Sequence, residues 1–371
     1  MRRKLVSLAA AGLLIMSTVA ACSDDDSAGG KAAVKQRGGD GTGMVGVILP
    51  DTESSQRWGS DDPRLLEAAF KAQDVPVTIK NANGSADEFK SLADKMIADN
   101  ATVLIIASLD PESGKYAIDR AHEAGVRVID YDRLTLNGNA DYYVSFNNKL
   151  VGQMQGEGLV KCLTAKGVKS PRVAYVNGSP SDNNATQFKE GYDGVLSKKF
   201  DSGAYLKGPD QSVDGWKPEL AKAIFTEMWN QYQNDINGVL SANDGMAAAV
   251  IDVLRARGMN GKIPVTGQDA SVEGLQNILA GDQCMTVYKP IKKEADAAAK
   301  LAIGIFKGDQ VKADQQTKDV ESGAYVASVL LDPIRIMKKD VKLVINDGFA
   351  KKDEVCAGTF AKYCPAAGIT K

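Results

Sequence analysis

Short apolar runs alternate with longer amphipathic segments from about residue 44 onward. The runs are rich in β-branched residues and predict buried strands, at 44–50, 77–80, 102–108, 126–132, 142–146, 172–177, 239–242, 265–267 and 285–288. The intervening segments carry apolar residues at helical spacing and predict helices, at 61–72, 85–97, 111–124, 150–163, 184–198, 218–232, 245–257 and 272–280. This alternation is typical of parallel sheets covered by helices on both faces. The chain of 371 residues is too long for one such sheet, so the pattern predicts an α/β protein with two lobes.

The residues before this region have the pattern of an export signal. Arg2, Arg3 and Lys4 precede an apolar run at 6–19, which is too short for a comfortable transmembrane helix and is typical of a cleavable signal peptide, 1–21. The sequence Val-Ala-Ala-Cys at 19–22 resembles a bacterial lipobox, which implies lipidation of Cys22; the alternative is an ordinary signal peptide with an incidental cysteine. Residues 22–43 lack apolar periodicity and are interpreted as a lipidated flexible tether.

Composition and charge exclude several classes of partner and chemistry. The chain is 44% hydrophobic and 25% charged with a net charge of −2, and no basic block follows the first residues, so a nucleic-acid partner is not expected. The cysteines at 162, 284, 356 and 364 lack the paired spacing of a zinc site, and an exported chain permits disulfides between them. The single histidine, His122, supports no Ser-His or Cys-His nucleophile. No metal or cofactor is expected.

Polar and aromatic side chains follow most of the predicted strands, where open α/β sheets bind their ligands. The segments are 55–58, 130–133, 177–184, 214–216, 241–244, 267–270 and 287–290. Amides, carboxylates and guanidinium groups bond vicinal hydroxyls in pairs, and indole rings cover the apolar faces of a sugar. A phosphate ligand would favour glycine-rich loops and excess positive charge, so the set predicts a neutral polyol.

Each member of this set also has a purely structural interpretation. Asp182 or Asn183, and likewise Asp244, are plausible helix N-caps. Trp216 is a candidate core anchor, and Arg57 with Trp58 is a candidate surface turn. Individually these signals are weak, whereas their recurrence at seven strand ends is strong.

The same motifs resemble those of bacterial sugar-binding proteins of ABC importers, in the ribose/galactose-binding family, and in particular its D-xylose-binding branch. The resemblance runs from about residue 44 to 354 and is carried by Arg57-Trp58, Tyr131-Asp132-Arg133, Gly178-Ser179-Pro180-x-Asp182-Asn183-Asn184-Ala185, Val213-Asp214-Gly215-Trp216, Ser241-x-Asn243-Asp244, Gly267-Gln268-Asp269-Ala270 and Thr286-Val287-Tyr288-Lys289-Pro290. It implies the type I periplasmic-binding-protein fold, with two Rossmann-like lobes of parallel sheets joined by a three-stranded hinge.

The resemblance also implies roles for individual residues. Trp58 and Trp216 would sandwich a pyranose, one from each lobe. The polar contacts would come from Arg57, Asp132, Arg133, Asp182, Asn183, Asn243, Asp269 and Lys289. The choice between Asp182 and Asn183 as the direct contact stays open.

The resemblance implies that the chain crosses between the two lobes near 145–147, 289–290 and 331–333. These crossings give an N-lobe of 44–145 plus 290–330 and a C-lobe of 146–289 plus 331–371, which places all four body cysteines in the C-lobe. Cys162 would lie about 22 Å along a helix that leaves the hinge, and Cys284 about 20 Å from the hinge along a strand. Within this lobe arrangement we predict the disulfides Cys162–Cys284 and, by remainder, Cys356–Cys364.

Three functions remain as hypotheses. The first is a lipid-anchored binding protein, expected to be monomeric, that closes on a monosaccharide outside the cytoplasm and presents it to an ABC permease and its ATPase; D-xylose leads, and glucose, galactose and arabinose stay open. The second is an exported glycosidase with carboxylates drawn from Asp132, Asp182 and Asp269, disfavoured because arginine-paired carboxylates are expected to stay ionised. The third is a sugar sensor or chemoreceptor ligand domain. The lipobox favours the surface of a Gram-positive cell over the periplasm. We expect a binding protein and not an enzyme.

Overall fold

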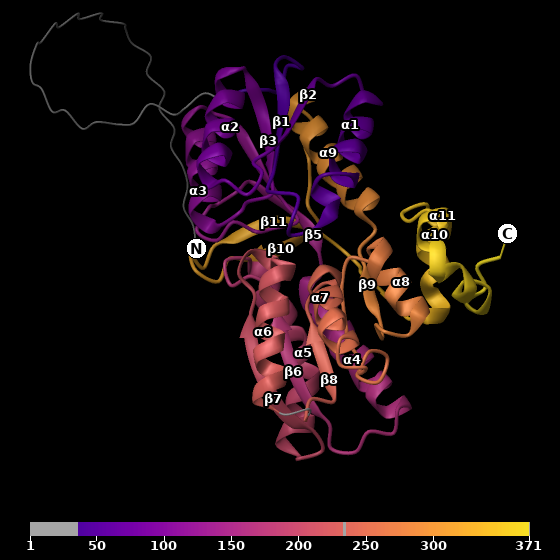
Figure 1. The fold of residues 1–371 in the computed structure, drawn as a ribbon. Coiled ribbons are helices and arrows are strands. Elements are labelled where there is room, and N and C mark those ends of the chain that lie inside the picture. Colours follow the sequence, from indigo (N-terminus) through magenta and orange to yellow (C-terminus); the bar gives the residue numbers. More distant parts are fainter. Residues whose placement is uncertain (1–35, 233–234, 371) are drawn as a thin grey trace, which may run out of the picture. The chain divides into compact units, whose positions relative to one another are not determined.

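The largest sheet is formed by the apolar runs of the first part of the chain. The computed structural model describes residues 36–232 and 235–370, so the predicted signal peptide and Cys22 lie outside the described residues (Figure 1). Seven strands lie in the order β10-β11-β5-β4-β3-β1-β2. Their bounds are Met44–Leu49 (β1), Val77–Asn81 (β2), Ala101–Ile106 (β3), Arg127–Tyr131 (β4), Tyr142–Phe146 (β5), Gln315–Lys318 (β10) and Tyr325–Leu331 (β11). All neighbours are parallel except β10 and β11.

Helices cover both faces of this sheet, because β1 and β3 are buried at nearly every position and carry apolar side chains toward both faces. Successive residues of a strand point to opposite faces, and so Val47 packs under one pair of helices while Ile48 packs under the other. The first pair is α1 (Asp61–Lys71) and α9 (Ile291–Lys307), and the second is α2 (Ala86–Ala98) and α3 (Pro111–Glu123). The expected N-cap of α2 is present, since the Ser85 hydroxyl accepts from the Glu88 N–H at 3.2 Å.

A second parallel sheet has the order β7-β6-β8 and is enclosed by four helices (Figure 1). Its strands are Arg172–Asn177 (β6), Leu206–Ser212 (β7) and Gly238–Ser241 (β8), and its helices are Asn148–Ala165 (α4), Asn183–Asp201 (α5), Pro218–Gln231 (α6) and Asp244–Arg255 (α7). Helices α4 and α5 approach so closely that a Cβ on Gly152 would lie 1.9 Å from the Phe188 carbonyl oxygen. Glycine is therefore required at this helix crossing.

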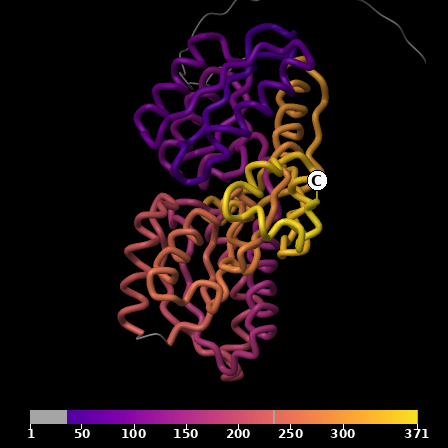
Figure 2. The backbone as a smooth tube through the Cα atoms, turned by 45° about the vertical axis from the view of Figure 1, so that its right-hand side comes forward, coloured from indigo at the N-terminus to yellow at the C-terminus, as the bar shows by residue number. Residues whose placement is uncertain are grey.

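A third element group ends the chain. Strand β9 (Thr286–Tyr288) pairs antiparallel with β12 (Ile334–Ile336), and α8 (Val272–Ala280) packs with them in one apolar cluster. The C-terminal segment, yellow in Figure 2, adds its own apolar side chains to this cluster. Its short helices are η3 (Lys338–Asp340), α10 (Val341–Asn346), α11 (Lys352–Val355), η4 (Gly358–Tyr363) and η5 (Pro365–Ala367).

Three connections join the seven-stranded sheet and its helices to the rest of the structure. Strand β5 leads directly into α4, β9 leads into α9, and β11 leads into β12. The first and last connections lie side by side, since the Asn147 N–H donates to the Leu331 carbonyl at 2.9 Å. This is the expected α/β fold with two parallel sheets.

The start of the described chain packs against the amino end of the seven-stranded sheet. The Arg37 N–H donates to the Gly125 carbonyl at 2.7 Å, just before β4, and Gly39 and Gly41 both donate to the Phe306 carbonyl at the end of α9. No helix within residues 36–232 or 235–370 is both long and apolar enough to cross a bilayer.

The structure differs from the sequence expectation at several elements. The predicted strand at 265–267 is wrong, because only Val265 forms an isolated bridge, to Val239. Strand β7 was not predicted because its sequence, Leu-Lys-Gly-Pro-Asp-Gln-Ser, is polar, as an edge strand permits. Helix α9 was not predicted, although its amphipathic pattern is regular.

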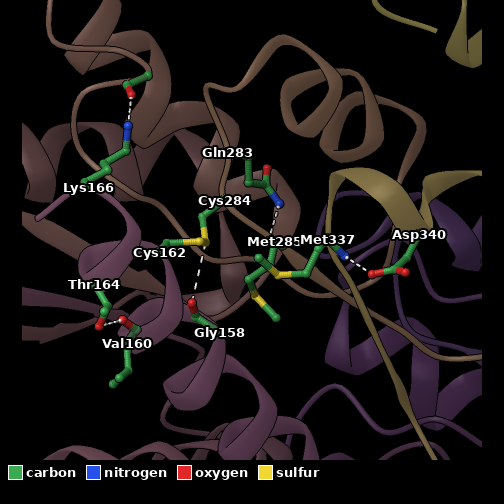
Figure 3. The surroundings of a disulfide bond; sticks show 11 residues. Gly158, Val160, Cys162, Thr164, Lys166, Gln283, Cys284, Met285, Met337 and Asp340 are labelled. Carbon is green, nitrogen blue, oxygen red and sulfur yellow. Dashed lines mark hydrogen bonds between the residues drawn. A yellow bond between two sulfur atoms is a disulfide. The ribbon is translucent and has the colours of Figure 1, made fainter. Parts of the chain in front are cut away.

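Both predicted disulfides are present. Cys162 on α4 bonds to Cys284, which precedes β9, with their Cα atoms 6.4 Å apart (Figure 3). Cys356 bonds to Cys364 in the C-terminal segment, with a Cα separation of 6.2 Å. The first bond links residues 122 apart in the chain, and the second links residues only 8 apart.

The two disulfides are expected to stabilise the protein unequally. Loop-closure entropy predicts a loss of about 5 kcal/mol when Cys162 and Cys284 are both changed to serine, and about 2.5 kcal/mol for the same change at Cys356 and Cys364. Guanidinium unfolding of the two double variants measures both values, and each is the other's matched control. An equal loss, or a larger one for the short loop, would contradict this account.

Candidate functional site

A small cavity lies where the carboxyl ends of strands from both sheets meet. Parallel α/β sheets place ligand sites at these strand ends because the loops there are free of packing constraints. The cavity is lined mainly by charged, amide and aromatic side chains. They are Ser54, Ser55, Arg57, Trp58, Asp132, Arg133, Asp182, Asn184, Phe188, Trp216, Asn243, Gln268, Asp269 and Lys289.

The loop after β1 presents Arg57 and Trp58 on a single 3-10 turn, η1 (Gln56–Trp58). Asp51 shapes this loop, since its carboxylate accepts from the N–H groups of Glu53 and Ser54 at 2.8 and 2.6 Å. The guanidinium carbon of Arg57 lies 4.3 Å from the centre of the Trp58 ring. The guanidinium therefore covers one face of this indole, because the electron-rich π system attracts a cation.

Three carboxylates hold the Arg57 guanidinium. Asp62 accepts from Nε and Nη2 at 2.8 and 2.6 Å, Asp132 accepts from Nη1 at 2.8 Å, and Glu294 accepts from Nη2 at 2.6 Å. All four side chains are buried. A bidentate pair together with two further charge-assisted bonds leaves the guanidinium little freedom to rotate.

Three donors of the cavity wall converge on the carboxylate of Asp132. One oxygen accepts from Arg57 and from the Lys289 Nζ at 3.0 Å, and the other accepts from the Asn184 Nδ2 at 3.1 Å. Burial alone would raise the pKa of Asp132, but Lys289, Arg57 and Arg133 together hold the pKa well below its ordinary value. Asp132 is thus a permanent negative charge.

Trp216 enters the cavity from the other sheet, on η2 (Asp214–Trp216). Its six-membered ring lies directly against Gly178, where a Cβ would come within 2.1 Å of the ring, and its Nε1 donates to Asp182 at 3.1 Å. The close approach explains the glycine in the segment after β6, because any side chain there would displace the ring.

Three residues of the cavity wall have left-handed backbone. Asp132, Trp216 and Asp269 have φ values of 62°, 60° and 105°, in the region that favours glycine. Aspartate tolerates this conformation better than tryptophan does. Such strain typically collects at ligand sites, where the surrounding contacts fix the side-chain direction.

Helix N-caps supply two further cavity residues. The Asp182 carboxylate accepts from the Asn184 N–H at 2.9 Å at the start of α5, and the Asn243 Oδ1 accepts from the Met246 N–H at 2.9 Å at the start of α7. A helix-cap role is therefore compatible with a place in the cavity wall. Asp244, a candidate cap in the sequence, is instead the first residue of α7, after the cap Asn243. Its carboxylate accepts hydrogen bonds from Gln283, Thr286 and Ser271, away from the cavity.

Direct polar contacts join the two sides of the cavity. Arg133 Nε lies 3.2 Å from Asp182 Oδ2, and the Ser55 hydroxyl donates to Asp269 Oδ2 at 3.1 Å. The Asn243 Nδ2 donates to the Ser54 carbonyl at 3.3 Å. These contacts bring the loops of the two sheets together.

The structure brings together all of the predicted ligand residues except one. Asn183 is buried but does not line the cavity, whereas its neighbour Asn184 does. The sequence analysis did not select five of the lining residues, namely Ser54, Ser55, Asn184, Phe188 and Gln268. Ser55, Asn184 and Gln268 lie within motifs that it singled out, and Phe188 lies one helical turn after Asn184.

The carboxylates of the cavity do not share one protonation behaviour. Burial raises the pKa of Asp182 although Arg133 opposes this, and burial likewise raises the pKa of Asp269 against the attraction of Lys289. The expectation that these arginine-paired carboxylates are all held firmly ionised therefore applies to Asp132 only. The lining offers both donors and acceptors to hydroxyl groups, with an indole from each side.

Comparison with known proteins places the chain in a family. Residues 45–310 match the family described as periplasmic binding protein domain. The chain is 35% identical to the D-xylose-binding periplasmic protein of Escherichia coli over 84% of this chain and 92% of that one. It is 31% identical to the multiple sugar-binding periplasmic receptor ChvE of Rhizobium radiobacter, over the same shares.

A solved structure shows the same relationship. The solute-binding protein of an ABC transporter from Clostridium phytofermentans, with bound β-D-glucose, superposes with a TM-score of 0.77 at 28% identity and covers 84% of this chain and 99% of that one. With two parallel sheets whose strand ends enclose one polar cavity, this chain belongs to the periplasmic binding protein domain family and has its type I fold.

Proposed function

We propose that the chain is an extracytoplasmic substrate-binding lipoprotein of an ABC sugar importer, and that it delivers a monosaccharide to a membrane permease. The observation that carries this proposal is the cavity itself. Two indoles from opposite sheets accompany a ring of charged and amide groups that can bond hydroxyls in pairs. The relatives are named as binding proteins, which supports a binding role and not a catalytic one.

D-xylose is the leading ligand. The proposal rests on the relatives named for D-xylose in Escherichia coli and Haemophilus influenzae, each 35% identical to this chain. Glucose is the second candidate because the structural neighbour from Clostridium phytofermentans binds it. The direct ligand contacts would come from the predicted residues that line the cavity, with Asn184 in place of Asn183.

The two sheets would move as lobes. We propose an N-lobe of 44–145 plus 290–330 and a C-lobe of 146–289 plus 331–371, joined at the three connections described above. Sugar contacts from both lobes would stabilise the closed arrangement, as expected for hinge closure around a ligand. Arg133–Asp182 and Ser55–Asp269 would break on opening, since each pair joins the two lobes.

Calorimetry against a panel of aldoses tests the function directly. D-xylose is expected to bind most tightly, with a large favourable enthalpy because the contacts are hydrogen bonds in a buried site. Glucose, galactose and arabinose are the comparison ligands. Tighter binding of another aldose would change the proposed ligand, and the absence of heat with every monosaccharide would refute sugar binding.

The tryptophans provide a sharper test of the geometry. Replacing Trp216 or Trp58 by alanine is expected to weaken binding by about 2 kcal/mol or more, roughly 30-fold in Kd, because each loses a fully buried aromatic contact. The matched control is Trp229, which is buried in the core of the second sheet away from the cavity. Trp229→Phe should leave Kd unchanged. Unaltered affinity in both cavity variants would exclude the stacking roles.

The lipid anchor needs its own experiment. The mature protein from its native cells is expected to begin at Cys22 and to carry covalently attached lipid, which mass spectrometry of the N-terminal peptide detects. Cys22→Ser should move the protein from the membrane fraction to the soluble fraction, because the polar segment 22–43 without a lipid lacks the anchoring free energy. A mature N-terminus without lipid would rule out the anchor.

A further inference from the structure

Glu294 is a buried carboxyl group that lies behind the cavity and not in its wall. It occupies the first turn of α9, is fully buried and does not line the cavity. Its Oε2 accepts from Arg57 Nη2 at 2.6 Å. Its Oε1 has no hydrogen-bond partner among the described residues. The side-chain hydrogen bond of Glu294 therefore links it to the cavity through Arg57.

The donors of Arg57 are almost fully used by its carboxylates. A guanidinium has five N–H groups. Asp62 takes two of them, Glu294 takes the second N–H of Nη2, and Asp132 takes one N–H of Nη1. One N–H of Nη1 remains for a ligand hydroxyl. Glu294 fixes Nη2 and so fixes the direction of that remaining donor.

The charges around Glu294 do not balance when every carboxyl group is ionised. The charged or titratable groups that face it are Arg57, Asp62, Tyr131, Asp132 and Lys289. The third cation near Asp132, Arg133, is itself paired with Asp182, so two cations are left to compensate three buried carboxylates. An uncompensated buried charge costs several kcal/mol, so one of the three carboxyl groups should hold a proton.

The hydrogen bonds decide which group holds the proton. Asp62 accepts from Arg57 twice and from the Tyr131 hydroxyl at 2.6 Å. Asp132 accepts from Arg57, Lys289 and Asn184. Glu294 accepts one bond and has an unpartnered oxygen. Donors stabilise the ionised form, so the proton belongs on Glu294.

We propose that Glu294 is a protonated positioning residue whose neutral carboxyl group orients Arg57 for sugar binding, so that loss of its proton weakens binding. The inference rests on the proposed sugar-binding function. Burial raises the pKa of Glu294 to about 8, against the attraction of Arg57, which agrees with the hydrogen-bond argument. Above this pH the ionised carboxylate would compete with Asp132 and the ligand for the donors of Arg57 and Lys289.

The effect on folding has a defined sign. The pKa of Glu294 rises from its ordinary value of 4.5 to about 8 in the folded protein, so the folded state keeps a proton that the unfolded state releases. Its contribution to stability is complete below pH 4.5 and is lost as the pH rises through about 8. Glutamine imitates the protonated side chain and cannot ionise.

The test compares the wild-type protein with Glu294→Gln and Glu294→Ala by calorimetry with D-xylose between about pH 6 and about pH 10. Wild-type affinity should fall about tenfold across this range, the equivalent of one hydrogen bond to a charged group. Glu294→Gln should bind like the wild type near neutral pH and show no fall. Glu294→Ala should bind at least about tenfold more weakly throughout, because Nη2 loses its acceptor. The control Glu123→Gln makes the same change at an exposed helix position and should behave as the wild type.

Two outcomes would overturn the proposal. One is a Glu294→Gln variant that binds as weakly as Glu294→Ala near neutral pH, which would make Glu294 an ionised counterion. The other is a wild-type affinity that does not change through about pH 8. If no aldose binds at all, the proposed function fails, and thermal unfolding without sugar still decides the protonation state. The wild type should then lose stability relative to Glu294→Gln as the pH rises from about 5 to about 8, and parallel curves would refute the proton on Glu294.

Discussion

The guanidinium of Arg57 joins parts of the chain that are far apart in sequence. Its partners come from the first turn of α1, the end of β4 and the start of α9, and Asp132 extends the network to Lys289 and Asn184. Because every one of these groups is buried, none can be removed without leaving a charge or a donor unpaired. The orientation of the cavity's polar groups is thus a consequence of charge compensation and not of the loops alone.

The same residues serve both the scaffold and the cavity. Asp182 accepts a hydrogen bond from a backbone N–H at the start of α5 and another from the indole of Trp216. Asn243 caps α7 and also donates to the loop after β1. A change at either position would disturb a helix end together with the site. Left-handed backbone at Asp132, Trp216 and Asp269 adds a cost that the surrounding contacts must offset.

Much of this architecture could be predicted from the sequence, for a physical reason. Buried parallel strands are expected to be apolar throughout, and therefore the carboxylates at the end of β4 stand out against their own strand. The disulfide Cys162–Cys284 followed from helix and strand lengths within the two-lobe arrangement. The edge strand β7 was missed because solvent exposure permits polar residues. The strand at 265–267 was overestimated, because only Val265 of this Val-Thr-Gly segment forms a bridge.

The finer composition of the site was harder to infer. Asp182, Asn183 and Asn184 are adjacent, and only the helix start at Asn183 decides which of them point into the cavity. Glu294 was not considered, although an acidic residue on the apolar face of α9 is the kind of exception that marks a functional group. Its meaning depends on three-dimensional neighbours that no local pattern contains.

The packing of residues 37–41 has a mechanical consequence. These residues bond to Gly125 and Phe306, at the amino end of β4 and the carboxyl end of α9, whereas Asp132 and Glu294 lie at the opposite ends of the same two elements. At about 3.3 Å per strand residue, Gly125 and Asp132 are separated by roughly 20 Å. A pulling force transmitted through the leading segment therefore enters the body far from the cavity, and shears hydrogen bonds that take no part in holding a ligand. Tension at residues 37–41 would therefore load hydrogen bonds other than those that line the cavity.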